Sequence, residues 1–338
     1  MARMSQWNVV LCSGSEHLRE KLERNFAVYT SATNYDGKRA FPNSDIYSRL
    51  ASIGELSDKN VCVIQSCTYS SESEKEKFTT GDRLFEMLQF LQILNNPVKI
   101  VQNGPDRKVE SRLAPPRNVI ALYTHLPFSK QDGVYQTGEV PSAELAVHLT
   151  LQTGAKKVVA IDPHPPQQFE WIKKLAQVGS FETISVVPKM IQEAKKRFEL
   201  KDSMILIPPG KMRYETLAQI SHLTKERVDS YSVIVKGEAP VKGKNVIVVD
   251  DMTLSGTTLQ RTYQKIVDLG AKSVCCCVPH VIPLVSEGED RIRQLIRKTD
   301  KHILASNTVR SRVFEEEYPE LLVDCSTSIV DYLRRISA

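Results

Sequence analysis

The chain lacks the features that mark membrane, disulfide-rich and zinc-binding proteins. No hydrophobic run approaches the roughly 20 residues that a helix needs to cross a bilayer. The opening stretch, MARMSQWNVVLCSG, has no long apolar segment behind a basic one, so we expect no secretory signal. The seven cysteines form no CxxC pair, which argues against a disulfide framework and a structural zinc site. We therefore expect a cytoplasmic protein in a reducing compartment, with no membrane partner.

Aromatic residues are also scarce, at 7% of the chain, and the basic residues are scattered. A surface that stacks nucleic-acid bases needs Lys and Arg interleaved with aromatic side chains, and no segment has that pattern. We therefore expect no nucleic-acid partner. The net charge of +5 suits a protein that binds phosphorylated small molecules.

What the sequence does contain is an alternation of short apolar, β-branched runs and segments with helical spacing, which is typical of parallel α/β sheets. Eight runs predict strands: Val9–Cys12, Val61–Gln65, Val119–Tyr123, Val158–Ile161, Met204–Ile207, Val233–Val235, Val246–Val249 and Val274–Val278. Six segments predict helices: His17–Phe26, Asp82–Leu94, Ser142–Gln152, Pro188–Phe198, Thr257–Leu269 and Arg291–Arg297. Asp82 and Ser142 are the expected helix caps, and Gly154 and Gly270 the expected helix stops. Cys275, Cys276 and Cys277 are expected to be buried on a strand.

The length of 338 residues predicts two domains of about 150 residues each. The first four and the last four strands form two similar sets, and the proline-rich stretch Pro163–Gln168 lies between them. We place the domains at residues 1–160 and 161–305. The tail, residues 306–338, is expected to return to the first domain.

The strongest signal for function is VIVVDDMTLSGTTL, residues 246–259, an apolar strand followed by two acids, a polar loop and a helix start. Asp250 and Asp251 follow the strand, where open α/β sheets bind ligands, and they can accept hydrogen bonds from vicinal ribose hydroxyls or hold a divalent cation. The loop offers N–H groups and hydroxyls to a phosphate at a helix N-terminus. Its predicted phosphate-binding residues are Thr253, Leu254, Ser255, Gly256, Thr257 and Thr258. As a purely structural alternative, the acids would cap the helix and the loop would be an ordinary turn.

These residues resemble the phosphoribosyl-diphosphate motif of type I phosphoribosyltransferases, and the whole chain resembles a divergent ribose-phosphate diphosphokinase. The further segments that carry this resemblance are VVLCSGS, AFPNSDIY, VIQS, Gly81–Asp82, PFSKQD, Ser142–Ala143, IDPH and Asn307–Thr308. The resemblance implies an α/β fold of two tandem type I phosphoribosyltransferase-like domains, each with a mainly parallel sheet flanked by helices. It also implies transfer of a diphosphoryl group from ATP to ribose 5-phosphate, with Mg²⁺ as cofactor, by a dimer-based homo-oligomer of up to six chains.

The same resemblance assigns roles to residues. Phe41, Asn43 and Asp45 correspond to the family's adenine-contacting segment, and Lys130, Gln131 and Asp132 to a second nucleotide-binding stretch. His164 is implied in catalysis and in holding the metal, and Asp250 is the other implied metal ligand. Lys236, at the end of YSVIVK, falls where the family's catalytic lysine would lie.

Four departures from the family's pattern concern the site. Gly210 replaces a metal-binding acid, while Lys211 and Arg213 add cations to the same loop. Lys236 is followed by Gly237 instead of completing a Lys-x-Arg, and Gly138 and Leu254 replace an arginine and a small or acidic residue. A Lys-x-Arg does occur at Lys225–Glu226–Arg227. We expect this segment to end a helix over Lys211–Arg227, because a shorter helix could not cross the sheet, and this favours Lys236 as the catalytic lysine.

The family resemblance and the four departures from it are together compatible with three functions. The first is an active diphosphokinase. The second is a catalytically weak regulatory subunit that joins another synthetase in a hetero-oligomer, which the lost acid and the short loop favour. The third is a phosphoribosyltransferase that acts on another acceptor, for which Phe41, Asn43 and Asp45 would have no use.

Overall fold

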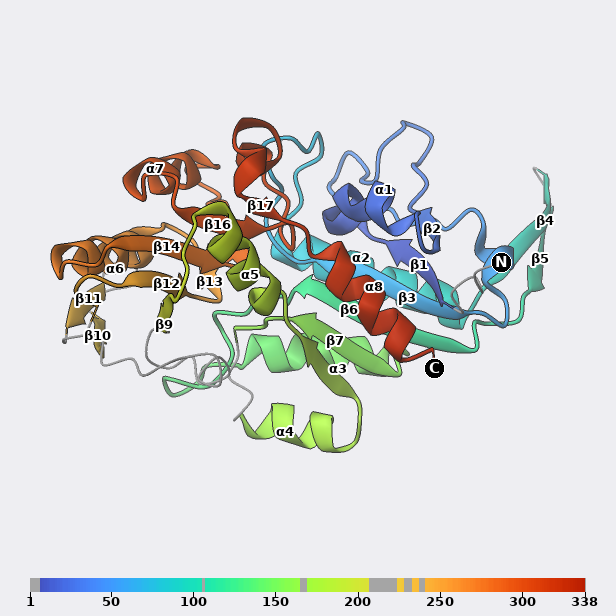
Figure 1. Ribbon diagram of the computed structural model, residues 1–338. Helices are drawn as coiled ribbons and strands as arrows, with labels where there is room; N and C mark the ends of the chain where they lie inside the picture. The colour runs from blue at the N-terminus through green and yellow to red at the C-terminus, as the bar shows by residue number, and fades with distance from the viewer. Residues whose placement is uncertain are drawn as a thin grey trace.

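The computed structural model describes residues 7–104, 107–164, 169–206, 224–227, 233–236 and 241–337. Two parallel sheets lie side by side, with helices on their faces (Figure 1). The first has the order β2-β1-β3-β6-β7-β8, and the second β17-β16-β14-β12-β9. The first sheet comprises β1 (Trp7–Leu11), β2 (Ala27–Thr30), β3 (Asn60–Ser66), β6 (Asn118–His125), β7 (Lys157–Ile161) and β8 (Phe181–Ile184). The second comprises β9 (Met204–Leu206), β12 (Asn245–Val249), β14 (Ser273–Val278), β16 (Ile303–Ser306) and β17 (Leu322–Val323).

Most of the predicted strands and helices are present. The predicted helices correspond to α2 (Thr80–Asn95), α3 (Ser142–Gln152), α5 (Val187–Arg197), α6 (Thr257–Asp268) and α7 (Asp290–Lys298). The predicted helix His17–Phe26 is wrong: a 3₁₀ helix, η1 (Ser13–Leu18), leads into the single turn α1 (Arg19–Leu22). The reason is that the amides of Asn25 and Phe26 both donate to the carbonyl of Leu22, which turns the chain into β2.

The helix ends follow the expected chemistry with two corrections. Thr79, not Asp82, is the N-cap of α2, and Asp82 completes a capping box by accepting from the Thr79 amide at 2.7 Å. Ser142 is the first residue of α3 instead of its cap, and its hydroxyl donates to Gln131 at 2.6 Å. The helix stops are confirmed, because Gly154 and Gly270 have φ of +114° and +83°, a region that favours glycine.

One predicted strand of the parallel sheets lies elsewhere. Among the described residues, β11 (Val233–Lys236) pairs antiparallel with β10 (Thr224–Arg227) in a separate two-stranded sheet, with Lys225 opposite Val235. The segment Lys225–Glu226–Arg227 is therefore a strand and not the end of a helix from Lys211, as the sequence analysis had it. Backbone pairing with β11 is the interaction that a helix would not have provided.

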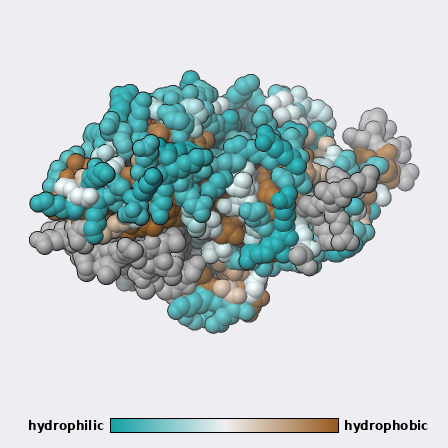
Figure 2. Space-filling view, in the orientation of Figure 1, coloured by the Kyte–Doolittle hydropathy of each residue, from teal (hydrophilic) through white to brown (hydrophobic). Residues whose placement is uncertain are grey.

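Several elements were not predicted. They are β2, β8, β16, β17, α4 (Glu170–Gln177), α8 (Ser326–Arg335), the two-residue strands β13 (Met252–Thr253) and β15 (His280–Val281), the short helices η2 (Ile53–Leu56), η4 (Val313–Glu317) and η5 (Pro319–Leu321), and the hairpin of β4 (Val98–Gly104) and β5 (Arg107–Arg112). The hairpin projects from one end of the molecule (Figure 1), and apolar side chains of β4 are visible there on the surface (Figure 2). Val98, Ile100 and Val101 are all exposed. A pattern of charged and apolar residues next to a proline gave no clear strand signal at this place.

Three large apolar clusters make up the core. One lies between α2, α3 and α4 and the first sheet, and another between α6, α7 and the second sheet. The third is continuous over one face of each sheet and includes residues of α5 and α8. It contains Cys275 and Cys277, and all seven cysteines are free and buried, as expected for the three on β14.

The chain passes from the first sheet to the second between β8 and β9, whereas the predicted domain boundary lies near residue 160. β8 pairs with β7 and so belongs to the first sheet. The last helix, α8, packs against α1, and Arg334 donates to Asn25 at 2.8 Å. The boundaries at residues 160 and 305 remain predictions. Within the described residues, no helix is both long enough and apolar enough to span a membrane.

Candidate functional site

The acid pair lies at the carboxyl end of β12, a strand inside the second sheet. Asp250 is 6% exposed and Asp251 is fully buried. The amide of Asp251 donates to the Asp250 carboxylate at 3.0 Å, which fixes the turn after the strand. Both carboxylates therefore lie at the sheet edge where parallel α/β folds bind their ligands.

The loop after the acids leads directly into the N-terminus of α6. Gly256 has φ of +71°, and a Cβ atom at this position would lie 3.1 Å from the Leu295 side chain. The left-handed turn and the close approach of α7 thus both require glycine here. Thr253 and Gly256 are buried, while Leu254, Ser255, Thr257 and Thr258 are half-buried. Because the first amides of a helix have no partner within it, this loop can hold an anion.

His164 brings the first sheet to the acid pair. It follows β7, and its Nδ1 lies 2.8 Å from Oδ2 of Asp251. Asp162, two residues before it, has φ of +38°, and its carboxylate accepts from the hydroxyl of Ser185 at 2.6 Å and the amide of Val186 at 2.9 Å. The turn that carries His164 is thus held in an unusual backbone conformation by β8 and the residues after it.

The carboxylates at this site suit a Mg²⁺ ion that is bound together with a substrate phosphate. Mg²⁺ usually takes one or two carboxylates from the protein and completes its octahedron with water and substrate phosphate oxygens. The described part of the chain has no group of three or more metal-binding side chains. Asp250, followed by Asp251 with His164 at 2.8 Å from that second carboxylate, therefore suits an ion that arrives with a substrate rather than one held by a full protein cage.

A second set of buried polar residues supports this site; its two histidines were not predicted, whereas Thr308 was identified only as part of the resemblance. His280 on β15, His125 at the end of β6 and Thr308 after β16 are all buried. The rings of His125 and His280 meet edge to face with centroids 5.0 Å apart. Burial, and secondarily the charge of His280, lowers the pKa of His125 well below its ordinary value. The available signal was that His280 and Thr308 each follow the end of an apolar strand.

The predicted nucleotide-binding residues lie in two loops. Phe41, Asn43 and Asp45 share a loop between β2 and β3, where Asn43 donates to Asp45 at 2.7 Å and the rings of Phe41 and Tyr47 meet at 5.5 Å. These three side chains are exposed, and the contacts within the loop are local. They are therefore free to meet a ligand or another chain at the surface.

The other predicted nucleotide-binding stretch follows β6, and its three residues differ in exposure. Lys130 and Gln131 are exposed. Asp132 is 3% exposed and accepts from the hydroxyl of Tyr135 at 2.7 Å. Since β6 and β7 are adjacent parallel strands, this stretch and His164 leave the sheet at the same edge.

Other predicted positions cannot be placed as side chains. Gly210, Lys211 and Arg213 lie outside the described residues. For Lys225 and Lys236 only the backbone strands β10 and β11 are described. β11 lies against α6, the helix that begins at the phosphate-type loop.

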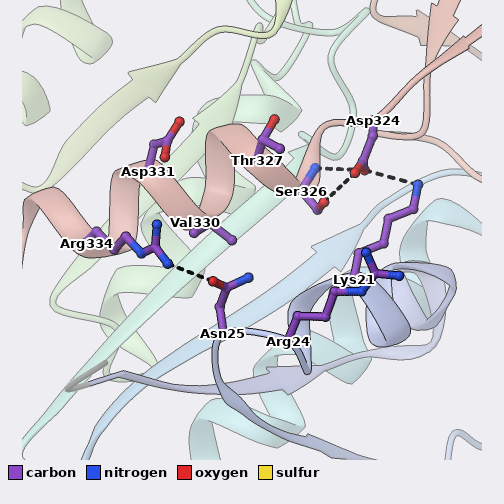
Figure 3. Close-up of a pocket in the computed structure, with 9 residues that line it drawn as sticks. All are labelled: Lys21, Arg24, Asn25, Asp324, Ser326, Thr327, Val330, Asp331 and Arg334. Atoms are coloured by element: carbon purple, nitrogen blue, oxygen red, sulfur yellow. Dashed lines mark hydrogen bonds and ion pairs between the residues drawn. The ribbon is translucent and has the colours of Figure 1, made fainter. Parts of the chain in front are cut away.

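A separate cavity of about 310 Å³ lies between α1 and α8 (Figure 3). Lys21 is paired with Asp324 at 3.3 Å, and the Asp324 carboxylate also accepts from Ser326. Arg334 donates to Asn25 across the cavity. These contacts link the first and last helices, and we assign this cavity no ligand.

Comparison with known proteins shows which class of fold the chain has. Residues 188–318 match the family model described as a phosphoribosyl transferase domain, which begins in α5 and ends beyond the second sheet's central strands. A crystal structure of phosphoribosylpyrophosphate synthetase from Mycobacterium smegmatis aligns with a TM-score of 0.70 at 17% identity and covers 98% of each chain. The fold is therefore that of two tandem phosphoribosyltransferase-like α/β domains, as the sequence predicted.

Similar sequences indicate which enzymes with this fold the chain resembles. A ribose-phosphate pyrophosphokinase of Pyrococcus abyssi is 25% identical over 337 residues, which are 97% of each chain. The enzyme of that name from Saccharolobus solfataricus is 27% identical over 203 residues, 57% of this chain and 66% of its own length. Ribose-phosphate pyrophosphokinase and ribose-phosphate diphosphokinase are two names for the same enzyme family. Along nearly its whole length, the chain is similar to ribose-phosphate pyrophosphokinases at about a quarter of identical residues.

Proposed function

We propose that this protein transfers the diphosphoryl group of ATP to the anomeric hydroxyl of ribose 5-phosphate, giving phosphoribosyl diphosphate and AMP. The observation that carries the proposal is the 2.8 Å contact between His164 and Asp251, which joins the carboxyl edges of the two sheets. A reaction between two phosphorylated substrates needs both to be held in line at one place. A site built from both sheets meets that requirement.

In this proposal the second sheet binds the sugar. The loop Thr253–Thr258 and the N-terminus of α6 take the 5-phosphate, because the N-terminus of a helix with a loop of hydroxyl side chains suits an anion. Asp250 and Asp251 accept hydrogen bonds from the ribose hydroxyls. The buried carboxylate of Asp251 is oriented by His164, so that the sugar meets a fixed acceptor.

The first sheet binds the nucleotide. Lys130, Gln131 and Asp132 lie at its carboxyl edge, and Phe41, Asn43 and Asp45 contribute from an exposed loop. When bound, Mg²⁺ neutralises charge on the phosphates, and Asp250 and His164 are the residues that we propose to hold it. An exposed adenine loop also fits assembly into a homo-oligomer in which another chain closes the pocket. We place the protein in the cytoplasm, in accordance with its reduced, buried cysteines.

We propose Lys225, rather than Lys236, as the lysine that stabilises charge on the transferred group. The Lys225–Glu226–Arg227 segment was set aside as part of a helix, but it is a strand. The family's pattern is a Lys-x-Arg followed by a hairpin, and β10, which contains Lys225–Glu226–Arg227, pairs antiparallel with the next described strand, β11. The Lys-x-Arg pattern and the antiparallel partner strand therefore favour Lys225 over Lys236.

The test is incubation of the purified protein with ATP, Mg²⁺ and ribose 5-phosphate, followed by chromatography with mass detection of AMP and phosphoribosyl diphosphate. Asp250→Asn should abolish both products. Asp268→Asn is the matched control, because Asp268 lies at the far end of α6, where its carboxylate accepts from Gln264 at 2.8 Å. Equal amounts of both products, lost only in Asp250→Asn, support the proposal. Binding of ribose 5-phosphate without any product would favour the regulatory-subunit alternative.

A further inference from the structure

His280 is buried at the point where the two sheets meet. It begins the short strand β15, which pairs in parallel with β13, so that His280 lies opposite Met252. Its backbone amide donates to the carbonyl oxygen of Asp251 at 3.2 Å. The backbone of His280 is therefore bonded directly to a residue of the acid pair.

The ring of His280 reaches the other sheet. Its Nε2 lies 3.0 Å from the carbonyl oxygen of Ile161 and 3.1 Å from that of Asp162. A carbonyl oxygen can only accept, so Nε2 carries a proton and donates it to the end of β7. One side chain of the second half thus holds the turn from which His164 projects.

Thr308 fixes the opposite side of this ring. Its hydroxyl lies 2.9 Å from Nδ1 of His280. Its carbonyl oxygen accepts hydrogen bonds from Thr124 at 2.7 Å and Ser66 at 2.8 Å, at the ends of β6 and β3. The imidazole is therefore clamped between strand ends of both sheets and has little freedom to rotate.

These contacts form a closed circuit of four residues. Asp251 bonds to the backbone of His280, the ring of His280 bonds to Asp162, and His164, two residues on, returns to the side chain of Asp251. Two of the four residues belong to each half of the chain. The ring of His280 consequently links the backbone of Asp251 to the turn that carries His164.

We infer that His280 is a positioning residue of the site: its Nε2–H holds the end of β7 at the separation from Asp251 at which His164 meets that carboxylate. The inference rests on the proposed function for its kinetic consequences, but the geometry stands without it. His280 touches neither sugar nor nucleotide in this role, and it acts only through His164 and Asp251. Its loss should therefore reduce turnover far more than sugar binding.

Three substitutions separate positioning from simple stabilisation. His280→Gln keeps a donor that reaches about as far as Nε2, so it should hold the carbonyl oxygens of Ile161 and Asp162. His280→Leu fills a similar volume but has no donor, and His280→Asn has a donor that is too short to reach. His302→Leu is the matched control, because His302 likewise bonds a backbone carbonyl, that of Asp300, on the far side of the second sheet.

The full-length variants are compared by kcat and KM in the diphosphoryl-transfer assay and by calorimetry with ribose 5-phosphate. We expect kcat to fall about 100-fold in His280→Leu and His280→Asn, the size of effect that a displacement of about 1 Å produces. The dissociation constant of ribose 5-phosphate should stay within about threefold of the wild type, and His280→Gln should recover most of the turnover. Parallel loss of binding and turnover, or no rescue by glutamine, would show a merely structural role.

A crystal structure of His280→Leu, or of His280→Asn if the leucine variant does not fold, distinguishes this inference from the proposed function. The distance from His164 Nδ1 to Asp251 should exceed hydrogen-bonding range, compared with 2.8 Å in the unchanged chain. An unchanged distance would overturn the inference even if the enzyme were active. If the wild type makes no product, the proposed function fails, and the crystal structure still decides the role of His280.

Discussion

The Nδ1 atom of His164 lies 2.8 Å from the carboxylate of Asp251, although 87 residues separate them in the chain. If this pair acts as one unit, the effects of replacing its members are not additive. We expect His164→Gln and Asp251→Asn each to lower kcat/KM about tenfold or more. The double variant should lose little beyond the worse single variant. Combining His164→Gln with Asp268→Asn should instead give additive effects, and additive losses in the first pair would contradict the coupling.

The two candidate lysines can be distinguished by paired substitutions. Lys225→Met should lower kcat about 100-fold, because a cation that stabilises charge in phosphoryl transfer contributes mainly to the transition state. Lys236→Met, on the neighbouring strand, should retain most of the activity. Steady-state kinetics with saturating ATP and ribose 5-phosphate measures both. The reverse order of effects would return the role to Lys236.

Gly256 allows a test of the phosphate loop. In Gly256→Ala the new Cβ meets Leu295 at 3.1 Å in a backbone with φ of +71°, so the loop and the start of α6 must shift. We expect the free energy of unfolding to fall by about 1 kcal/mol or more and the affinity for ribose 5-phosphate to fall about tenfold.

The control is Gly243→Ala, which has φ of +73° but no atom within 4 Å of the new Cβ. It shares the backbone strain without the clash and lies away from the loop. Calorimetry should therefore find unchanged sugar affinity in this variant. Equal loss of affinity in the two variants would mean that the loop is not the phosphate site.

His125 predicts a dependence of stability on pH. Its pKa in the folded protein lies well below the ordinary value, chiefly because of burial and next because of the nearby His280. Protons therefore bind the unfolded state more readily, and the stability that depends on neutral His125 is present above about pH 6.5 and is lost as the pH falls below it. Thermal unfolding between pH 7.5 and about pH 5 should show a shallower decline in His125→Leu than in the wild type. Identical slopes would assign the decline to other groups.

The sequence predicted the parts of the fold that local patterns encode. All eight apolar runs are strands, and five of the six helices lie where their spacing placed them. The acid pair and the loop before α6 were recognised because strand, acids and helix start are contiguous. Their proposed roles await experiment.

What the sequence did not reveal depends on contacts between distant segments. Nothing near Lys225 indicates that it pairs with Val235, because an edge hairpin is fixed by its partner strand. Nor does the segment around His280 indicate that its ring bonds to Asp162, 118 residues away. Contacts of this kind can be identified only when the three-dimensional arrangement of the strands is known.

The position of α8 bears on when the protein can fold. This helix follows all the strands in the sequence, yet Ile329, Tyr332 and Leu333 belong to the same apolar cluster as Val9 and Leu11 of the first strand. Its Arg334 bonds to Asn25 across 309 residues of sequence. During synthesis, the strands of the first sheet therefore leave the ribosome well before α8, and until then this helix does not cover their apolar face. A chain that stops before Ser326 would leave that face without α8, so one helix of ten residues controls the exposure of an apolar face that begins with the first strand.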